Sequence, residues 1–377
     1  MAVAEPDPAS PKQEKEEAST EVVEVVPGIL RLQLPIDFTG LGHVNCYALV
    51  DGRGVALVDP GLPGEGTWQA LGARLAAAEI PLERVHTVVV THSHPDHYGS
   101  AGLLAERTGA DVVAFERFRT RWDETDLDDD ELTPAGTPAD GPQPGPTPGS
   151  PSGPSPEELE AEVIDVERML NQPSPWGGTP FGPPPERLEM IREHAAEFLR
   201  WMRPPSPTIR IADGGRITLG GRDWVGLFTP GHTDDHLCLH SEDGGILLAG
   251  DQVLPTITPH VSGFLTDDSL NRYVESLDRL TGLPGVELVL PAHGHPFGDL
   301  GRRVAEIKRH HDERLDELLR IGAEVGEASV VDLSQRLFAP RSWGAMAEDE
   351  TFAHLEHLRL AGRAERREEA GILYYRL

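Results

Sequence analysis

The chain has 377 residues and carries 33 Lys and Arg residues against 63 Asp and Glu residues, a formal net charge of −30. This length exceeds one ordinary hydrophobic core and predicts two domains, or one domain with large insertions. The negative charge repels polyanions, so we do not expect a nucleic acid to be drawn to the protein by its overall field.

Cysteine use and the N-terminal composition indicate the compartment. Cys46 and Cys238 lie far apart within apolar runs, so both are expected to be reduced core thiols rather than a disulfide. Residues 1–20 are acidic, contain Pro and Lys, and lack the apolar segment of a signal peptide, which predicts a disordered leader. No apolar run is long enough to span a membrane. We therefore expect a cytoplasmic protein without a membrane partner.

The first part of the chain after the leader alternates short apolar runs with Gly and Pro, a pattern typical of antiparallel strands. The strands are predicted over 22–26, 29–32, 43–50 and 55–58. The last of them ends at Asp59-Pro60-Gly61, and an amphipathic helix is predicted over 67–78.

A second apolar run, Val88-Val89-Val90, reads as a fully buried strand. It ends in a loop with four coordinating side chains within six residues, namely His92, His94, Asp96 and His97. Imidazole and carboxylate are the ligands that borderline divalent cations prefer. An ordinary polar loop is the alternative, but this density of ligands at a strand end favours a metal site. A helix over 100–107 and a strand over 111–115 follow.

The middle of the chain, from about residue 116 to 206, is predicted to be an insertion. Segment 123–156 has the composition of a disordered stretch, and helices are predicted over 156–170 and 185–201. The apolar residues of the insertion either cover the mouth of a site or form a surface elaboration or a dimer contact. These residues are Met169, Leu170, Trp176, Phe181, Met190, Phe198, Leu199, Trp201 and Met202.

Strand patterns resume after the insertion, and three strand ends again carry metal-binding side chains. The strands are predicted over 208–212, 216–219, 224–228, 237–240, 245–250 and 286–290, with a helix over 269–280 before the last. The side chains at their ends are His232, Asp251 and His293. From Asp299 the pattern becomes helical over 300–319, 330–338 and 349–360, and a β-like run over 371–375 closes the chain. This order predicts a winged-helix-like domain over 299–377.

Five motifs, in this order, resemble those of the metallo-β-lactamase fold superfamily. They are Asp59 after a strand, His-x-His-x-Asp-His at 92–97, Thr-Pro-Gly-His at 229–232, Gly-Asp at 250–251 and Pro-Ala-His-Gly at 291–294. The resemblance covers about residues 21–116 and 206–296. It implies an α+β fold with a four-layer αββα sandwich in a domain over 21–298.

The closest subgroup is suggested by two further segments. Thr229 to His236, together with the helical tail, is most similar to the lactamase-β-like-2 group, whose C-terminal part is a winged helix. Residues 251–260 are more similar to the thioesterase- or lactonase-like hydrolases of the superfamily. The resemblance therefore leaves the substrate open.

The resemblance also implies a two-metal site with only nitrogen and oxygen ligands. The implied ligands are His92, His94 and His232 for the first metal, Asp96, His97 and His293 for the second, and Asp251 as a bridge. Zinc is the default ion, and iron or manganese is compatible with this set. Two adjacent cations lower the pKa of a bridging water toward about 7 and make a hydroxide nucleophile at neutral pH.

Several residues near these motifs are expected to support the ligands. The resemblance implies that Asp59 orients a ligand histidine, the alternative being a turn residue. His236 and Asp235 either act behind the ligands or move protons, or they are structural. Tyr98 and His260 are candidates for the pocket wall. The other histidines are expected to be ordinary surface or core residues, and they are His43, His86, His194, His240, His310 and His311.

Three functions compete. The first is hydrolysis of a small ester, thioester (acyl-CoA-like) or lactone, which suits the acidic composition and an apolar lid. The second is a single-strand-specific endoribonuclease, against which stand the charge and a basic cluster (Arg359, Arg363, Arg366 and Arg367) that is interrupted by glutamates. The third is a DNA reader with a vestigial site, which the intact ligand set disfavours. We expect the tail to serve packing or homodimerisation, and we expect no β-lactamase because no secretion signal is present.

Overall fold

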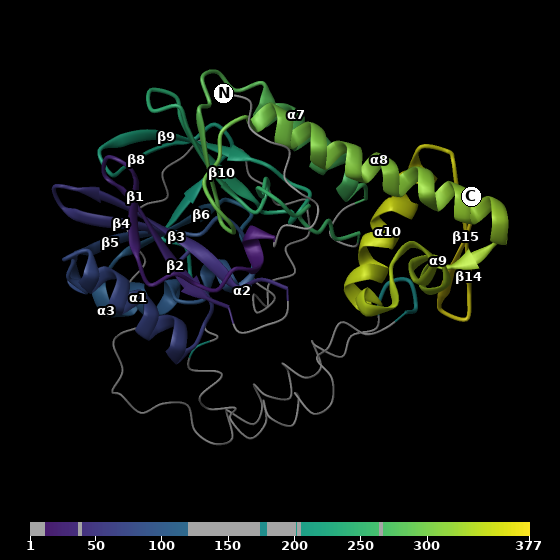
Figure 1. Ribbon diagram of the computed structural model, residues 1–377, viewed down its shortest axis with the longest axis horizontal. Helices are drawn as coiled ribbons and strands as arrows, with labels where there is room; N and C mark the ends of the chain where they lie inside the picture. Colours follow the sequence, from purple (N-terminus) through teal and green to yellow (C-terminus); the bar gives the residue numbers. More distant parts are fainter. Residues whose placement is uncertain (1–11, 37–39, 120–173, 179–200, 202–204, 264–266) are drawn as a thin grey trace, which may run out of the picture.

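The computed structural model describes residues 12–36, 40–119, 174–178, 201, 205–263 and 267–377. Two mixed sheets pack against each other with helices on their outer sides, and a smaller unit follows at the C-terminus (Figure 1). The stretch predicted to be disordered, 123–156, and the helix predicted over 156–170 lie outside the described residues. Of the helix predicted over 185–201, only residue 201 is described, and it is helical.

The first sheet has seven strands, which follow one another in space as they do in sequence. They are β1 (Val22–Val26), β2 (Ile29–Pro35), β3 (His43–Asp51), β4 (Gly54–Val58), β5 (Val85–Val89), β6 (Asp111–Phe115) and β7 (Ile209–Ile211). Neighbours are antiparallel from β1 to β4 and parallel from β4 to β7. Parallel neighbours need a crossover, and helices α1 (Glu65–Ala77) and α3 (Ala101–Thr108) supply two of these. The short helices η2 (Leu82–Arg84) and α2 (Pro95–Tyr98) lie in the same connections.

The second sheet has five strands in the spatial order β12-β11-β10-β9-β8. Their bounds are β8 (Arg216–Leu219), β9 (Arg222–Phe228), β10 (Leu237–Ser241), β11 (Ile246–Gly250) and β12 (Leu288–Pro291). Only β11 and β12 run parallel among these neighbours, and helix α7 (Ser269–Thr281) connects them. The side chain of Asp268 caps this helix by accepting a hydrogen bond from the amide of Asn271.

Three apolar cores separate the layers. The first lies between the first sheet and helices α1 and α3, and includes Leu71 and Leu104. The second lies between the two sheets and includes Trp224. The third joins the second sheet to α7 and to the start of α8 (Leu300–Val325), and includes Tyr273 and Ile307. The layers are therefore helix, sheet, sheet, helix, which confirms the predicted α+β sandwich.

The C-terminal unit continues from the long helix α8, which leads away from the sandwich (Figure 1). Its other elements are β13 (Ala328–Ser329), α9 (Val330–Leu337), η3 (Pro340–Ser342), α10 (Ala345–Leu360), β14 (Glu365–Glu369) and β15 (Ile372–Arg376). The strands form a small sheet in the order β13-β15-β14. The three predicted helices are present, although α8 ends later and α10 begins earlier than the sequence pattern indicated. The winged-helix assignment of this unit stays a prediction.

Trp176, from the predicted insertion, lies in the core of the C-terminal unit. Its side chain is fully buried against Phe352 of α10, and its indole Nε1 donates to Glu348 at 2.9 Å. Its backbone carbonyl accepts from the amide of Leu373 at 3.1 Å. The hypothesis that Trp176 covers the mouth of a site is therefore wrong. Trp201 is half-buried, and the other apolar residues of that hypothesis lie outside the described residues.

The predicted disordered leader over 1–20 differs from the structure in its second half. Residues Gln13–Lys15 form the short helix η1, and the side chain of Glu14 is fully buried. This carboxylate accepts from the amides of Thr256 and Ile257 at 2.7 and 3.0 Å, and also from the Thr256 hydroxyl. Composition alone indicated disorder because it does not reveal three donors that converge on one acidic side chain. Residues 1–11 lie outside the described residues.

We predict that Glu14→Gln lowers the free energy of unfolding by about 1.5–3 kcal/mol, since hydrogen bonds to a buried charged group are replaced by weaker ones. Denaturant unfolding followed by circular dichroism measures this change. The control is Glu17→Gln at an exposed position of the same segment, for which we expect a change within about 0.5 kcal/mol. Equal behaviour of the two variants would contradict the anchoring role of Glu14.

Candidate metal centre

The ends of five strands meet at one edge of the sandwich. Asp59 follows β4, the 92–97 loop follows β5, and His232 follows β9. Asp251 follows β11 directly, and His293 follows β12. All seven predicted metal ligands come together there in two groups, which we call the first cluster and the second cluster. The first cluster is His92, His94, His232 and Asp251, and the second cluster is Asp96, His97 and His293.

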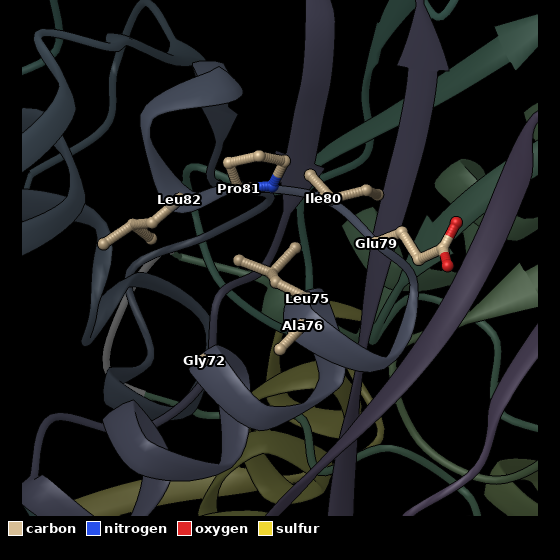
Figure 2. Close-up of a pocket in the computed structure, with 7 residues that line it drawn as sticks. All are labelled: Gly72, Leu75, Ala76, Glu79, Ile80, Pro81 and Leu82. Carbon is tan, nitrogen blue, oxygen red and sulfur yellow. The ribbon is translucent and has the colours of Figure 1, made fainter.

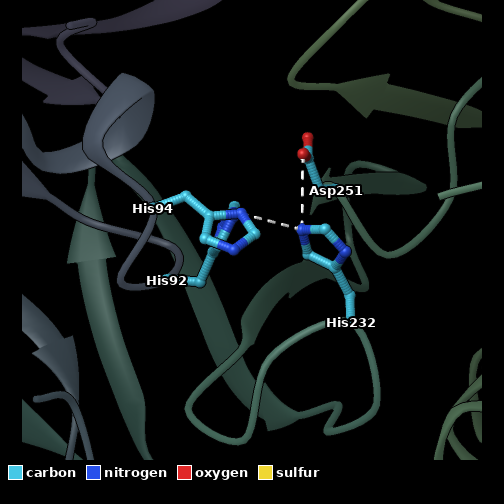
Figure 3. Close-up of side chains that lie close together, drawn as sticks. All are labelled: His92, His94, His232 and Asp251. Carbon is cyan, nitrogen blue, oxygen red and sulfur yellow. Dashed lines mark hydrogen bonds and ion pairs between the residues drawn. The ribbon is translucent and has the colours of Figure 1, made fainter. Parts of the chain in front are cut away.

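In the first cluster, one ligand atom from each residue lies within 4.8 Å of every other. The Nδ1 atom of His94 lies 3.0 Å from Nε2 of His92 and 3.1 Å from Nε2 of His232 (Figure 3). The side chains enter from opposite sides, His92 and His94 from the loop after β5 and His232 and Asp251 from the second sheet (Figure 3). Three imidazole nitrogens and a carboxylate around one point form a donor set for a divalent cation.

Asp251 faces the second cluster as well as the first. Its Oδ2 atom lies 3.6 Å from Nε2 of His232 and 3.6 Å from Nε2 of His97. Its Oδ1 atom lies 3.3 Å from Nε2 of His293. Asp96 completes the second cluster, with Oδ2 3.5 Å from His97 Nε2 and 3.4 Å from His293 Nε2. The two clusters therefore share one carboxylate.

In three of these histidines, the ring nitrogen that is directed away from the clusters donates a hydrogen bond to an oxygen of the protein. Nδ1 of His232 donates to the carbonyl of His260 at 2.7 Å, and Nδ1 of His293 donates to the carbonyl of His43 at 2.7 Å. Nδ1 of His97 donates to Asp59 at 2.9 Å. Since each acceptor can only receive a proton, Nε2 is left unprotonated on the side of the clusters in the neutral ring.

Asp59 connects two ligand histidines. Its carboxylate accepts from the amide and the hydroxyl of Thr91 at 2.9 and 2.8 Å, in addition to His97. The Thr91 hydroxyl lies 3.0 Å from Nδ1 of His92, so its lone pair can accept from that ring. Asp59 has a left-handed backbone with φ of +53°, a conformation that Asp adopts more readily than most residues. The structure thus places Asp59 against a ligand histidine, as the resemblance implied.

The buried atoms that face the centre fit a bound cation. Nε2 of His97, Nε2 of His293 and Oδ1 of Asp251 are buried and have no hydrogen-bond partner among the described residues. Buried polar atoms normally have hydrogen-bond partners, so three such atoms around one point fit a shared divalent cation. Neither thiol competes for this role, because Cys46 and Cys238 are fully buried and burial raises the pKa of Cys238 to about 12.

The electrostatics of the two clusters differ. Burial and the neighbouring His232 lower the pKa of His94 to about 3, and burial lowers that of His92 well below its ordinary value. Burial also lowers the pKa of His293, but Asp251 and Asp96 outweigh it and raise the value to about 10. Asp96 and Asp251 likewise raise the pKa of His97 well above its ordinary value against the effect of burial. Without a cation, the first cluster is therefore neutral at its histidines and the second is protonated.

His236 lies behind the first cluster, stacked on His92 with ring centroids 5.0 Å apart. Its Nδ1 atom pairs with the Thr229 hydroxyl at 2.9 Å, and its Nε2 atom accepts from the amide of Asp251 at 3.1 Å. Gly250 makes this contact possible, because it has φ of +50° and a Cβ there would lie 2.7 Å from Nε2 of His236. Both ring nitrogens are thus occupied within the protein, an arrangement that suits positioning of Asp251 and leaves no atom for a moving proton.

Asp235 supports the loop between two ligands. Its Oδ1 atom accepts from the amide and the hydroxyl of Ser93, at 3.4 and 3.2 Å. Burial raises its pKa to about 7. Tyr98, in contrast, is buried in the first apolar core near Phe118. Tyr98 was a candidate for the pocket wall, and the short helix α2 instead carries it into this core.

Two residues with a place in the site were not singled out by the sequence. His43 was expected to be an ordinary histidine, yet its carbonyl orients His293 and its Nε2 accepts from the amide of Gly294 at 3.1 Å. Thr91 links Asp59 to His92. A backbone carbonyl has no sequence signal, whereas Thr91 directly precedes the histidine motif and could have been included with it.

A separate cavity of about 380 Å³ lies at the C-terminal end of α1, where Leu75, Ile80, Pro81 and Leu82 form an aliphatic lining (Figure 2). Glu79 is its one charged residue. None of the ligands lines it, and it offers no group of convergent polar side chains.

The family model described as "Metallo-beta-lactamase superfamily" matches residues 39–293, and the chain belongs to this superfamily. A metallo-beta-lactamase family protein from Thermus thermophilus has a similar crystal structure, with a TM-score of 0.68 and 29% identity, covering 94% of this chain and 100% of that one. The probable metallo-hydrolase YqjP of Bacillus subtilis is 26% identical over 303 residues, 76% of this chain and 81% of that protein.

A hydroxyacylglutathione hydrolase from Gloeobacter violaceus is 28% identical over 172 residues, which cover 42% of this chain and 66% of that protein. Fungal lactamase-like proteins also match, with the matched stretch spanning about a third of their length. Together with the two clusters, the family match defines a superfamily member with a candidate metal centre. Within the part of the chain that the structure describes, no helix is both long and apolar enough to cross a bilayer.

We predict that Asp59→Asn weakens metal binding by about 10–100-fold, the usual effect of losing a partner behind a ligand. An amide facing Nδ1 of His97 favours the tautomer that carries its proton on Nε2, where the ligand lone pair is needed. Competition with a chromophoric chelator measures the affinity, and Asp111→Asn, at an exposed aspartate of β6, is the control. A metal affinity equal to that of the wild type in Asp59→Asn would refute the role of Asp59 in orienting His97.

Metal binding is predicted to release protons at pH 7, because His97 and His293 are protonated without a cation and ligands must be deprotonated. We expect at least about two protons per protein on zinc loading. The affinity should rise as the pH approaches 10, where His293 of the apo protein loses its proton without the metal. Calorimetry in buffers of different ionisation enthalpy measures the release, and heats that are independent of the buffer would contradict it.

Proposed function

We propose that the protein is a dinuclear metal-dependent hydrolase that cleaves a small ester, thioester or lactone. The observation that carries the proposal is the position of Asp251, whose oxygens lie 3.3–3.6 Å from histidines of both clusters. A carboxylate shared between two ligand groups suits two adjacent cations better than one. We take zinc as the metal, since the donors are imidazole nitrogen and carboxylate oxygen atoms.

The residues of the two clusters and their neighbours would have distinct roles in this hydrolase. His92, His94 and His232 would hold one cation, and Asp96, His97 and His293 the other, with Asp251 between them. Bound there, such cations supply a water that is acidic near neutral pH and polarise the scissile carbonyl. Asp59 and His236 keep His97 and Asp251 in place. No Ser or Cys nucleophile is needed.

A small acyl substrate is supported by two observations. The similarity to a protein named as a hydroxyacylglutathione hydrolase favours a thioester over a phosphodiester. The net charge of −30 opposes a polyanion. The metal ligands do not decide the substrate, because the same ligands suit hydrolysis of a thioester or of a phosphodiester.

The endoribonuclease alternative loses support from the ion pairs of the tail. Arg359 and Arg366 both bind Glu356, at 2.8 and 3.0 Å, and Arg367 binds Glu327 at 2.7 Å. A guanidinium that is already paired with a carboxylate attracts phosphate less than a free one. We therefore propose that the C-terminal unit is a winged-helix-like domain that serves packing rather than nucleic-acid binding.

We predict that the zinc-loaded protein hydrolyses a medium-chain acyl-CoA, and that Asp251→Ala lowers this activity by more than about 100-fold, since loss of a ligand exceeds loss of a residue behind it. Thiol release measures the reaction. Asp243→Ala, at an exposed turn aspartate, is the matched control and should behave as wild type. Single-stranded RNA is incubated with the same samples.

Each outcome separates the alternatives. RNA cleavage that disappears in Asp251→Ala, without thioester cleavage, would replace the proposed substrate by RNA. Absence of both activities in a protein that binds two zinc ions would redirect the search to lactones and oxyesters. Thioester cleavage that persists in Asp251→Ala would overturn the dinuclear mechanism.

A further inference from the structure

The loop after β11 connects the metal centre to the C-terminal unit. It carries His260, whose carbonyl accepts from Nδ1 of the ligand His232 at 2.7 Å. A backbone carbonyl can orient a ligand only if its own loop is held in place. Glu14 holds the loop at Thr256 and Ile257, before His260.

Asp349 of helix α10 holds the same loop on the other side of that carbonyl. Its Oδ2 atom lies 2.9 Å from Nε2 of His260, and its Oδ1 atom accepts from the amide of Gly263 at 2.9 Å. The carboxylate is fully buried. A single side chain of the C-terminal unit thus binds both ends of the 260–263 turn.

The packing around Gly263 shows how closely this turn lies on α10. A Cβ at Gly263 would lie 2.6 Å from the backbone nitrogen of Ala353 and 2.8 Å from Cδ1 of Phe352. There is no space in which the turn could shift toward the helix. Its position is therefore set jointly by backbone contact and by the Asp349 carboxylate.

Another buried carboxylate on the same helix behaves differently. Glu356 binds Arg359, Arg366 and the Tyr375 hydroxyl, all within the C-terminal unit. Its contacts stabilise that unit alone. Asp349 thus contacts the loop beside the metal centre, whereas Glu356 contacts only residues of the C-terminal unit.

We propose that Asp349 is a positioning residue of the metal centre, which fixes the His260 carbonyl and through it the ligand His232. The C-terminal unit then completes the hydrolase site rather than forming an independent appendage. This inference rests on the proposed metal centre, and it adds a residue that lies outside the superfamily match at 39–293.

The test compares Asp349→Asn with Glu356→Gln in the full-length protein. We expect Asp349→Asn to weaken Zn²⁺ binding at the first cluster by about 10–100-fold and to change the visible spectrum of the Co²⁺-loaded protein, because His232 loses its fixed orientation. Glu356→Gln should keep both properties, even where it lowers the melting temperature. Metal content after dialysis, chelator competition and the Co²⁺ spectrum are the measurements.

A second variant covers the case in which Asp349→Asn does not fold. His260→Asn keeps the backbone carbonyl and the contact between Asp349 and Gly263 but removes the ring that Asp349 binds, so it should also lower the affinity. Where all variants fold, the loss in the double variant should be smaller than the product of the single losses, since both variants remove the contact between Asp349 and the His260 ring.

The outcomes distinguish this inference from the proposed function. A wild-type protein that binds no zinc would refute the metal centre itself. A wild-type protein with two zinc ions, alongside Asp349→Asn with unchanged affinity and Co²⁺ spectrum, would refute only the positioning role. Equal losses in Asp349→Asn and Glu356→Gln would also refute it, because they would indicate a general loss of stability.

Discussion

The metal centre depends on the fact that an imidazole has two nitrogens, so that the nitrogen bound by the protein determines where the other points. His232, His293 and His97 each donate Nδ1 to a fixed oxygen, and their Nε2 atoms consequently face the clusters. These oxygens come from the loop after β11, from the start of β3 and from the end of β4. Distant segments must therefore be in register before the ligands can converge.

Backbone conformation carries part of this constraint. Asp59 occupies a left-handed conformation at the end of β4, which brings its carboxylate under Thr91 and His97. Gly250 occupies another at the end of β11, and its missing side chain leaves room for the His236 ring beneath Asp251. Both positions end a buried strand that the apolar cores hold firmly. The sheets thus hold the strand ends rigidly, and the turns that follow the strands direct the side chains toward the metal centre.

The ligands could be predicted from the sequence because their identity lies in side chains that follow recognisable strands. The supporting contacts could be predicted only in part. Asp59 followed from the resemblance, but the carbonyls of His43 and His260 could not, since every residue has a carbonyl and only the fold selects one. Glu14 and Trp176 were misjudged for a related reason, because composition describes a segment without the partner surface on which it orders.

Sequence periodicity describes the start of helix α10 poorly. It is buried on most of its circumference, including the polar residues Glu348, Asp349 and His354, so no polar face marks its start. Each buried carboxylate has a partner in a different segment, Trp176 for Glu348 and His260 for Asp349. Removing one partner of a buried hydrogen bond costs about 1–3 kcal/mol, because the remaining group is left unsatisfied. Separating the 260–263 turn from α10 therefore costs free energy. The His260 carbonyl, which accepts from His232, remains in place for as long as the C-terminal unit is folded.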